Sequence, residues 1–104
     1  MQKFATYAVI SPEGCAAILW HDRKFAPQAA EALKPTAVDM QNFGLIDAII
    51  DEPKEGAHRN LEKAADLLGD ALYKSLEELL KVPQDKLLAA REKRLRDLGE
   101  FKAS

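Results

Sequence analysis

The sequence has very few of the residues that build disulfides, metal clusters and phosphate-binding turns. It contains one cysteine, Cys15, which excludes an internal disulfide and a metal site made of several cysteines. Its five glycines are never adjacent, and they form neither a Gly-x-Gly-x-x-Gly turn nor a phosphate-binding loop. No histidine pair has the spacing of a zinc site, and no Ser, His and Asp order indicates a catalytic triad. We therefore expect no bound metal, and the sequence alone assigns no catalytic residue.

The chain also lacks a long apolar run and an excess of either charge. No stretch approaches the roughly 20 apolar residues that cross a bilayer, and residues 1–4 do not begin a signal peptide's apolar core. The net charge of −2 is unlike the strongly basic balance of phosphate-binding domains. We therefore expect no nucleic-acid or membrane partner, and a cytoplasmic location. The length of 104 residues suits one modest hydrophobic core.

An apolar segment near the N-terminus is typical of a strand that turns into a buried helix. Tyr7–Ile10 has the β-branched and aromatic composition of a strand. Ser11 can cap the helix, Pro12 suits its first position, and Glu13 lies favourably in its first turn. The helix body, Cys15–Trp20, carries no charge, and such helices are usually enclosed. We therefore expect other residues to cover it.

Prolines and glycines divide the next part of the chain into two helices and a second strand. Pro27 opens a short Ala-rich helix, which ends before the next proline because the residue preceding proline disfavours helical geometry. Thr36 caps another helix, and Gly44 ends it in the left-handed conformation. The nearly continuous apolar run Leu45–Ile50 predicts a buried strand.

The last part of the sequence predicts a loop followed by an amphipathic helical hairpin. The loop covers residues 51–60, and Asn60 is a good N-cap for the first helix. The apolar face of that helix, at spacings of three and four, consists of Leu61, Ala65, Leu68, Leu72, Leu76 and Leu79. Pro83 ends this helix. The apolar stripe of the last helix consists of Leu87, Leu88, Leu95 and Leu98.

Several consecutive motifs resemble a known family. They are Val9–Trp20, Ala26–Lys34, Gly44–Ile50 and Gly56–Asn60. In this order they are similar to the C-terminal part of the alpha subunit of the carboxyltransferase component of bacterial multi-subunit acetyl-CoA carboxylase. The unit Thr36–Ile50 also resembles a helix–glycine–strand piece of the crotonase superfamily, to which those subunits belong.

The resemblance implies a fold, a reaction and a set of partners. The fold class is α/β, the helix-dominated C-terminal portion of a crotonase-like fold with two short strands before the hairpin. Residues 1–53 end the crotonase-like core, and residues 54–104 form the hairpin. The implied function is part of the carboxyltransferase that moves a carboxyl group from carboxybiotin to acetyl-CoA, giving malonyl-CoA for fatty acid synthesis. The implied partners are the carboxyltransferase beta subunit, the biotin carboxyl carrier protein and acetyl-CoA; carboxybiotin is a substrate, and no cofactor is bound directly.

This reaction requires stabilisation of two oxyanions, the thioester enolate and the ureido oxygen of biotin. Backbone N–H groups at glycine-rich turns do this in the superfamily. The sequence has no adjacent glycines, so we expect those turns outside this chain and the chain alone to be inactive. The candidate substrate-binding residues, as a wall of the site, are Ser11, Pro12, Glu13 and Gly14.

Other polar residues have a structural explanation beside a functional one. Cys15 could be a nucleophile, or it could pack as a small hydrophobe in its uncharged helix. Glu13 could be a general acid or base, or a first-turn carboxylate stabilised by the helix dipole. His58 with Arg59 could bind an anion, or His58 could anchor its loop; Glu55 stands where the family usually has a glycine.

The remaining basic side chains are expected at the surface. His21 lies in a polar connector. The last helix carries a basic cluster in which acidic residues are interleaved, which is typical of a solvated face. It consists of Arg91, Lys93, Arg94 and Arg96.

Two other functions stay open at this point. The chain could be a non-catalytic helical module that docks onto a partner subunit, or it could belong to another crotonase-type acyl-CoA enzyme. An enzyme needs glycine turns outside this chain, whereas a docking module needs only the residues present.

Overall fold

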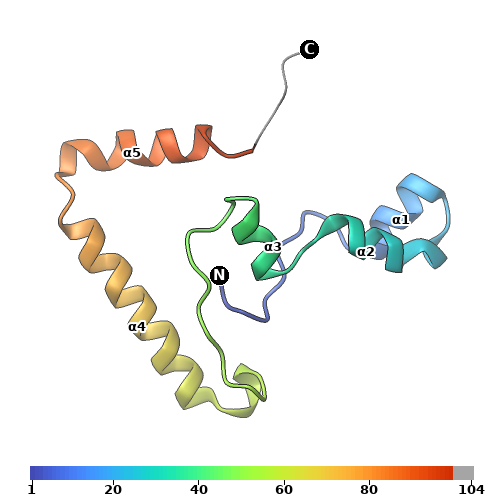
Figure 1. Ribbon diagram of the computed structural model, residues 1–104, viewed down its shortest axis with the longest axis horizontal. Coiled ribbons are helices and arrows are strands. Elements are labelled where there is room, and N and C mark those ends of the chain that lie inside the picture. The colour runs from blue at the N-terminus through green and yellow to red at the C-terminus, as the bar shows by residue number, and fades with distance from the viewer. Residues whose placement is uncertain (100–104) are drawn as a thin grey trace.

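The computed structural model describes residues 1–99 as short and long helices joined by extended segments (Figure 1). The α-helices are α1 (Pro12–Trp20), α2 (Ala26–Leu33), α3 (Ala37–Asn42), α4 (Leu61–Leu80) and α5 (Gln84–Arg96). Two 3₁₀ turns, η1 (Arg23–Phe25) and η2 (Ala57–Arg59), lie before α2 and α4. Within residues 1–99 no β-strand is formed, and β pairing is limited to the isolated bridges Gln2–Ile50 and Thr6–Thr36.

The two predicted strands, and with them the α/β class, are therefore wrong for this chain. In Tyr7–Ile10, Tyr7 N donates to the carbonyl oxygen of Pro35 at 3.0 Å, and the pairing stops there. In Leu45–Ile50, the only bridge is at Ile50, whose N–H donates to Met1 O at 2.8 Å, and Ala48 O accepts from the Met1 nitrogen at 2.8 Å. A ladder needs a neighbouring strand along its length, and the described residues supply a partner to only one end of each segment.

Helix α1 has the boundaries that the sequence predicts. Ser11 Oγ accepts a hydrogen bond from Gly14 N at 3.1 Å, and proline occupies the first turn. The helix ends at Trp20, followed by His21 in the left-handed conformation with φ of 56°. Helix α1 packs on α2, and one alanine of each helix, Ala16 and Ala29, is fully buried. Because both side chains are small, the two helices approach closely but bury little apolar surface.

Helix α3 also begins and ends where predicted. Thr36 Oγ1 accepts from Asp39 N at 3.3 Å and donates to the Asp39 carboxylate at 2.6 Å, so the two residues cap the helix together. Gly44 has φ of 67°, which confirms the left-handed end. The next residue, Leu45, turns back and donates its N–H to Met40 O at 2.9 Å.

Helices α4 and α5 form, but they do not make the predicted hairpin. Asn60 Oδ1 caps α4 by accepting from Lys63 N at 3.0 Å, as expected. After Pro83, α5 leaves at an angle and runs along a different side of the chain, so the two helices are not packed side by side (Figure 1). Residue 94 of α5 instead contacts the turn after α3. The division at residues 53 and 54 stays a prediction, and residues 100–104 lie outside the described residues.

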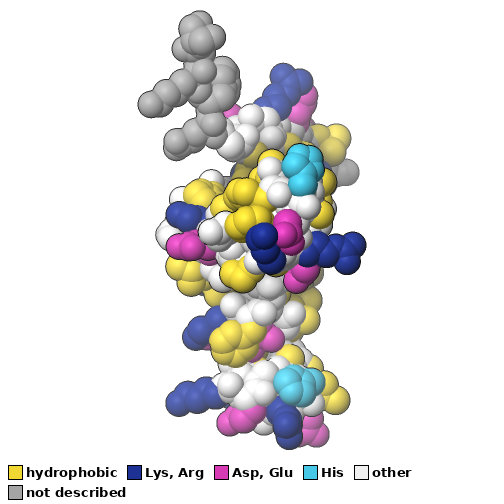
Figure 2. Space-filling view, turned by 90° about the vertical axis from the view of Figure 1, so that its right-hand side faces the viewer, with side chains coloured by type: hydrophobic (Ala, Val, Ile, Leu, Met, Phe, Trp, Pro, Cys, Tyr) yellow, Lys and Arg dark blue, Asp and Glu magenta, His cyan; other side chains and the backbone are white. Residues whose placement is uncertain are grey.

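The described chain buries almost no large side chain. Its buried apolar residues are Ala16, Ala29, Ala37, Met40 and Ala64. A compact domain of this length has a radius of gyration of about 13 Å, whereas this chain has 17.6 Å and extents of 50 × 47 × 17 Å. Figure 2 looks onto the α1–α2 end, where hydrophobic side chains gather at the surface between charged ones. The described residues therefore do not cover the apolar helix α1.

Candidate functional site

The candidate residues Ser11–Gly14 form the first turn of α1, where few backbone donors are free. Pro12 has no N–H, Gly14 N donates to Ser11 Oγ at 3.1 Å, and Cys15 N donates to Ser11 O at 2.9 Å. Glu13 N has no acceptor among the described residues. The turn therefore offers one N–H at the positive end of the helix dipole. An oxyanion hole of two backbone donors needs a second donor from elsewhere.

Close packing gives this turn a defined surface. A Cβ atom at Gly14 would lie 3.0 Å from Ile10 Cγ1 and 3.3 Å from Ser11 Oγ, so glycine allows Ile10 to pack against the turn. The side chains of Ser11 and Glu13 are exposed beside it. An apolar patch next to a hydroxyl and a carboxylate can contact a ligand. Among residues 1–99, no salt bridge or side-chain hydrogen bond joins Glu13 to a second titratable group.

The other candidate residues are not brought to this turn. Cys15 is a free, half-buried thiol inside α1. His21 is exposed and ends α1. His58 is exposed in η2, which lies at a different end of the chain from α1 (Figure 1). Its ring lies against Gly56, where an added Cβ would be 2.9 Å from His58 Cε1.

Gly56 is therefore the glycine that this loop requires. Its φ of 91° is unfavourable for other residues, and the His58 ring occupies the space of a side chain. The loop-anchoring interpretation of His58 fits this contact. In the sequence, the feature that could have indicated this contact is Gly56 itself, which lies between Glu55 and Ala57.

A groove that the sequence did not predict lies between the segment 45–51 and α4. Its volume is about 840 Å³, and Leu67, Ala71, Lys74, Ser75 and Glu78 line it from the helix. The lining mixes aliphatic and charged side chains, and none of Ser11–Gly14 belongs to it. The only sequence feature that pointed to this groove was the apolar run Leu45–Ile50. We interpreted that run as a strand.

The charged groups of the described residues are almost all at the surface. Lys3 pairs with Asp51 at 3.2 Å, with both side chains more than half exposed. The pKa of Asp22 is lowered, first because Lys24 N donates to its carboxylate at 2.9 Å and then because the Lys24 ammonium bonds to it. Across residues 1–99, no group of three or more His, Cys, Asp or Glu side chains is placed to hold a metal ion. None of the helices described is long and apolar enough to cross a membrane.

The basic cluster of α5 is solvated as predicted, with one exception. Arg96 pairs with Glu92 and Lys93 with Asp97 within the helix, and all four side chains are exposed. Arg94 differs because its guanidinium donates to Asp47 Oδ1 and to Gly44 O, at 3.1 Å each. Sequence spacing did not indicate this contact, since its partners lie far away along the chain.

Comparison with known proteins decides the family. Residues 1–99 match the family model described as acetyl co-enzyme A carboxylase carboxyltransferase-like. The chain belongs to this family. This confirms the resemblance seen in the sequence motifs, and it disfavours another crotonase-type acyl-CoA enzyme.

Three relatives, each named acetyl-coenzyme A carboxylase carboxyl transferase subunit alpha, show how the chain relates to the family. The Thermus thermophilus protein is 50% identical over 97 residues, 93% of this chain and 31% of the relative. The Marinobacter nauticus protein is 50% identical over 95 residues, 91% of this chain and 30% of the relative. The Anoxybacillus flavithermus protein is 46% identical over 101 residues, 97% of this chain and 31% of the relative. The chain thus spans about a third of the length of its relatives.

Proposed function

We propose that this chain forms part of a carboxyltransferase that moves the carboxyl group of carboxybiotin to acetyl-CoA, giving malonyl-CoA. The observation that carries the proposal is the family match over all of residues 1–99, together with 46–50% identity to proteins named as carboxyl transferase alpha subunits. Because the chain spans about a third of those proteins, it contributes one portion of the catalytic subunit.

The reaction sets what this portion has to provide. A proton leaves the methyl group of acetyl-CoA, the N–C bond of carboxybiotin breaks, the new C–C bond forms, and the ureido nitrogen takes up a proton. Negative charge develops on the thioester oxygen and on the ureido oxygen, and preorganised N–H donors stabilise it. The first turn of α1 leaves Glu13 N free, so an oxyanion hole at this turn takes its second donor from elsewhere.

Ser11, Pro12, Glu13 and Gly14 serve in this proposal as a wall of the substrate site. Ser11 closes their turn with two hydrogen bonds, one to its side chain and one to its carbonyl oxygen. Glu13 and Ser11 present exposed polar atoms to a substrate. The partners are the carboxyltransferase beta subunit, the biotin carboxyl carrier protein that delivers carboxybiotin, and acetyl-CoA.

A hybrid subunit tests this function. In it, this chain replaces the segment of the Thermus thermophilus alpha subunit with which it aligns, and the hybrid is combined with that organism's beta subunit, carboxybiotin and acetyl-CoA. We expect malonyl-CoA from the hybrid and none from this chain alone. A folded hybrid that assembles but makes no malonyl-CoA would contradict the proposal.

Variants of the hybrid test whether residues 11–14 contribute to substrate binding more than the rest of the chain does. Ser11→Ala with Glu13→Gln should raise KM or lower kcat, whereas Glu62→Gln on α4 should leave both unchanged. If the wall variant were as active as the parent hybrid, Ser11–Gly14 would not contact substrate.

The second candidate is a non-catalytic helical module that docks onto a partner subunit. The exposed leucines of α4 favour it, because they offer a contact surface without any catalytic group. Full activity of a hybrid whose α1 turn is altered, and loss of assembly when α4 is altered, would support the module instead.

A further inference from the structure

Helix α4 carries an apolar stripe that the described residues leave uncovered. The stripe consists of Leu61, Ala65, Leu68, Leu72, Leu76 and Leu79, which share one face at spacings of three and four. Four of its leucines stay more than half exposed: Leu61 (72%), Leu72 (60%), Leu76 (55%) and Leu79 (54%). No charged residue lies within the stripe. Four such side chains in one row form the kind of contiguous patch that marks an interaction surface.

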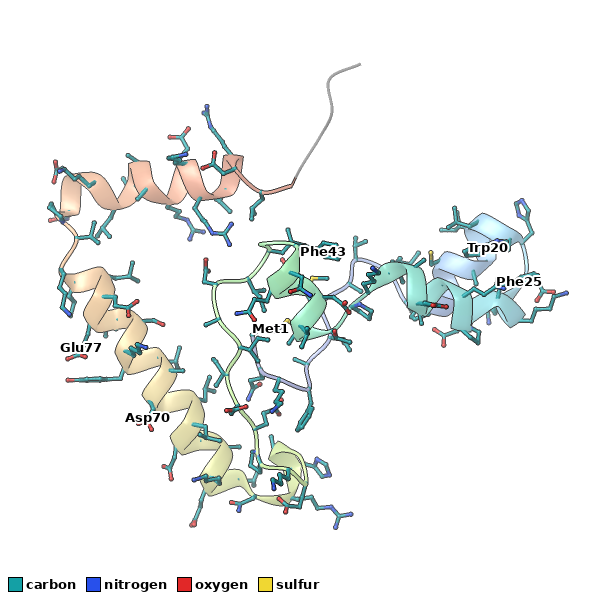
Figure 3. All side chains as sticks on the ribbon, in the orientation of Figure 1. Met1, Trp20, Phe25, Phe43, Asp70 and Glu77 are labelled. Carbon is teal, nitrogen blue, oxygen red and sulfur yellow. The ribbon has the colours of Figure 1, made fainter. Side chains whose placement is uncertain are left out.

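Charges occupy the other faces of the same helix. Asp70 and Glu77 point away from the rest of the chain (Figure 3), and Lys74 and Glu78 line the groove beside residues 45–51. Helix α4 is thus charged on its outer face, mixed on the face toward the groove, and apolar along the stripe, which is the face that such a helix buries. The missing cover has to be apolar where it meets the stripe.

The amount of exposed surface indicates how large that cover is. A folded protein of 11.5 kDa exposes about 5,800 Å², whereas this chain exposes 8823 Å². The excess of about 3,000 Å² far exceeds the roughly 800 Å² per partner of a standard interface. The relatives align with 93–97% of this chain but are about three times longer, so they contain enough further residues to supply such a cover.

We propose that the α4 stripe is a docking surface for the two thirds of a full-length alpha subunit that this chain does not span. The stripe then becomes part of that subunit's interior instead of a contact with solvent. A second copy of this chain is a poorer occupant. Pairing two stripes would leave the apolar side chains of α1, such as Ile18 and Leu19, exposed. The proposal rests on the family membership and makes no use of the catalytic role.

Two matched double variants test it in the hybrid subunit defined above. Leu72→Gln/Leu76→Gln places two glutamines in the stripe, and Asp70→Gln/Glu77→Gln places the same two residues on the solvated face. In the isolated chain, both should keep the helical circular dichroism signal of the parent, since all four sites are exposed. In the hybrid, the stripe variant should lower Tm by about 5 °C or more, because buried leucines are lost, and the control should not.

The readout is stability, so it is independent of activity: a hybrid without malonyl-CoA synthesis can still show the difference in Tm. Equal Tm values for the two variants in the hybrid would overturn the proposal. A dimer of the hybrid that Leu72→Gln/Leu76→Gln dissociates without lowering its Tm would assign the stripe to a second copy and overturn it as well.

A second measurement applies if the hybrid is insoluble. The tagged chain is co-expressed with the remaining two thirds of the Thermus thermophilus subunit as a separate polypeptide. Co-purification in equal amounts, lost with the stripe variant and retained with the control, supports docking. Absence of co-purification with the parent chain, or its persistence with the stripe variant, would refute it.

Discussion

Arg94 Nε lies 3.1 Å from Asp47 Oδ1, across 47 residues of sequence. The same guanidinium donates through Nη2 to the carbonyl oxygen of Gly44, also at 3.1 Å. Gly44 lies in the left-handed turn that follows α3, two residues after the helix ends at Asn42. Arg94 thus ties α5 to the turn after α3, and Asp47 holds the guanidinium in place.

The first prediction is that Arg94→Gln releases α5 from the turn after α3. The Arg94 side chain is 39% exposed and that of Asp47 86%, so the ion pair contributes at most about 1 kcal/mol to unfolding. The effect should therefore be local: faster amide exchange in Gln84–Arg96 with nearly unchanged overall stability. High salt should weaken the contact in the parent chain as well.

Arg91→Gln is the matched control for this experiment. It removes the same charge from α5 one turn earlier, where no partner is present among the described residues. Equal exchange in the two variants would show that Arg94 does not hold α5.

Local signals predicted the helix boundaries of this chain well. Ser11, Thr36 and Asn60 each cap the helix that follows, because a short polar side chain reaches an N–H three residues ahead regardless of the rest of the fold. Gly44 ends α3 for a similarly local reason, the left-handed backbone conformation.

Features that depend on distant partners could not be predicted in this way. Leu45–Ile50 has the composition of a strand, but a strand also needs a neighbour along its length. The described residues bond only its C-terminal end, at Ala48 and Ile50. Arg94 looked like part of a solvated cluster because its partners are 47 and 50 residues away. The hairpin was expected from the apolar stripes of α4 and α5, yet α5 is placed by this contact instead.

At the candidate site, too, local features could be predicted from the sequence, and features that depend on distant segments could not. The geometry of Ser11–Gly14 was predictable because it is a single helix turn. That the oxyanion-hole turns lie outside this chain stays a prediction, based on the lack of adjacent glycines in the sequence. The groove beside α4 was not predictable, because it arises from the separation of two segments that sequence patterns do not place relative to one another.

The second prediction concerns two glycines with opposite requirements. Gly44 has φ of 67° and an open Cβ position, so Gly44→Val meets no clash but forces a β-branched residue into left-handed geometry. It should cost about 1 kcal/mol or more of stability. Gly69 lies inside α4 with equally open space, so Gly69→Ala should instead stabilise by about 0.5–1 kcal/mol. Chemical denaturation of both variants gives the sign of each change in the free energy of unfolding. An unchanged value for Gly44→Val would contradict the strain expected from left-handed geometry.

The third prediction is a pH effect at η1. Hydrogen bonds from Lys24 lower the pKa of Asp22 from its ordinary value of 3.8. A depressed pKa in the folded state stabilises η1 above that value, and this contribution is lost as pH falls through the folded-state pKa. An NMR titration should place the Asp22 midpoint below 3.8 and show Lys24 N–H shifting with it. In the control variant Asp22→Asn, the pH-dependent shift of Lys24 N–H should vanish. In the parent chain, an Asp22 midpoint at or above the ordinary value would contradict the cap.

The last prediction is that the isolated chain does not close its own core. Val9 is 98% exposed, and Ile18 and Leu19 are 65% and 63% exposed. Burying each such side chain is worth roughly 1.5–3 kcal/mol, and a small domain has only about 5–15 kcal/mol of net stability. With a core of four alanines and one methionine, the chain forfeits much of that gain. We therefore expect it to self-associate or stay partly molten, with residues 60–99 as the most helical part. Sedimentation and amide exchange would decide it: a sharp monomer at micromolar concentration, with strong protection across Val9–Trp20, would show that these residues are covered after all.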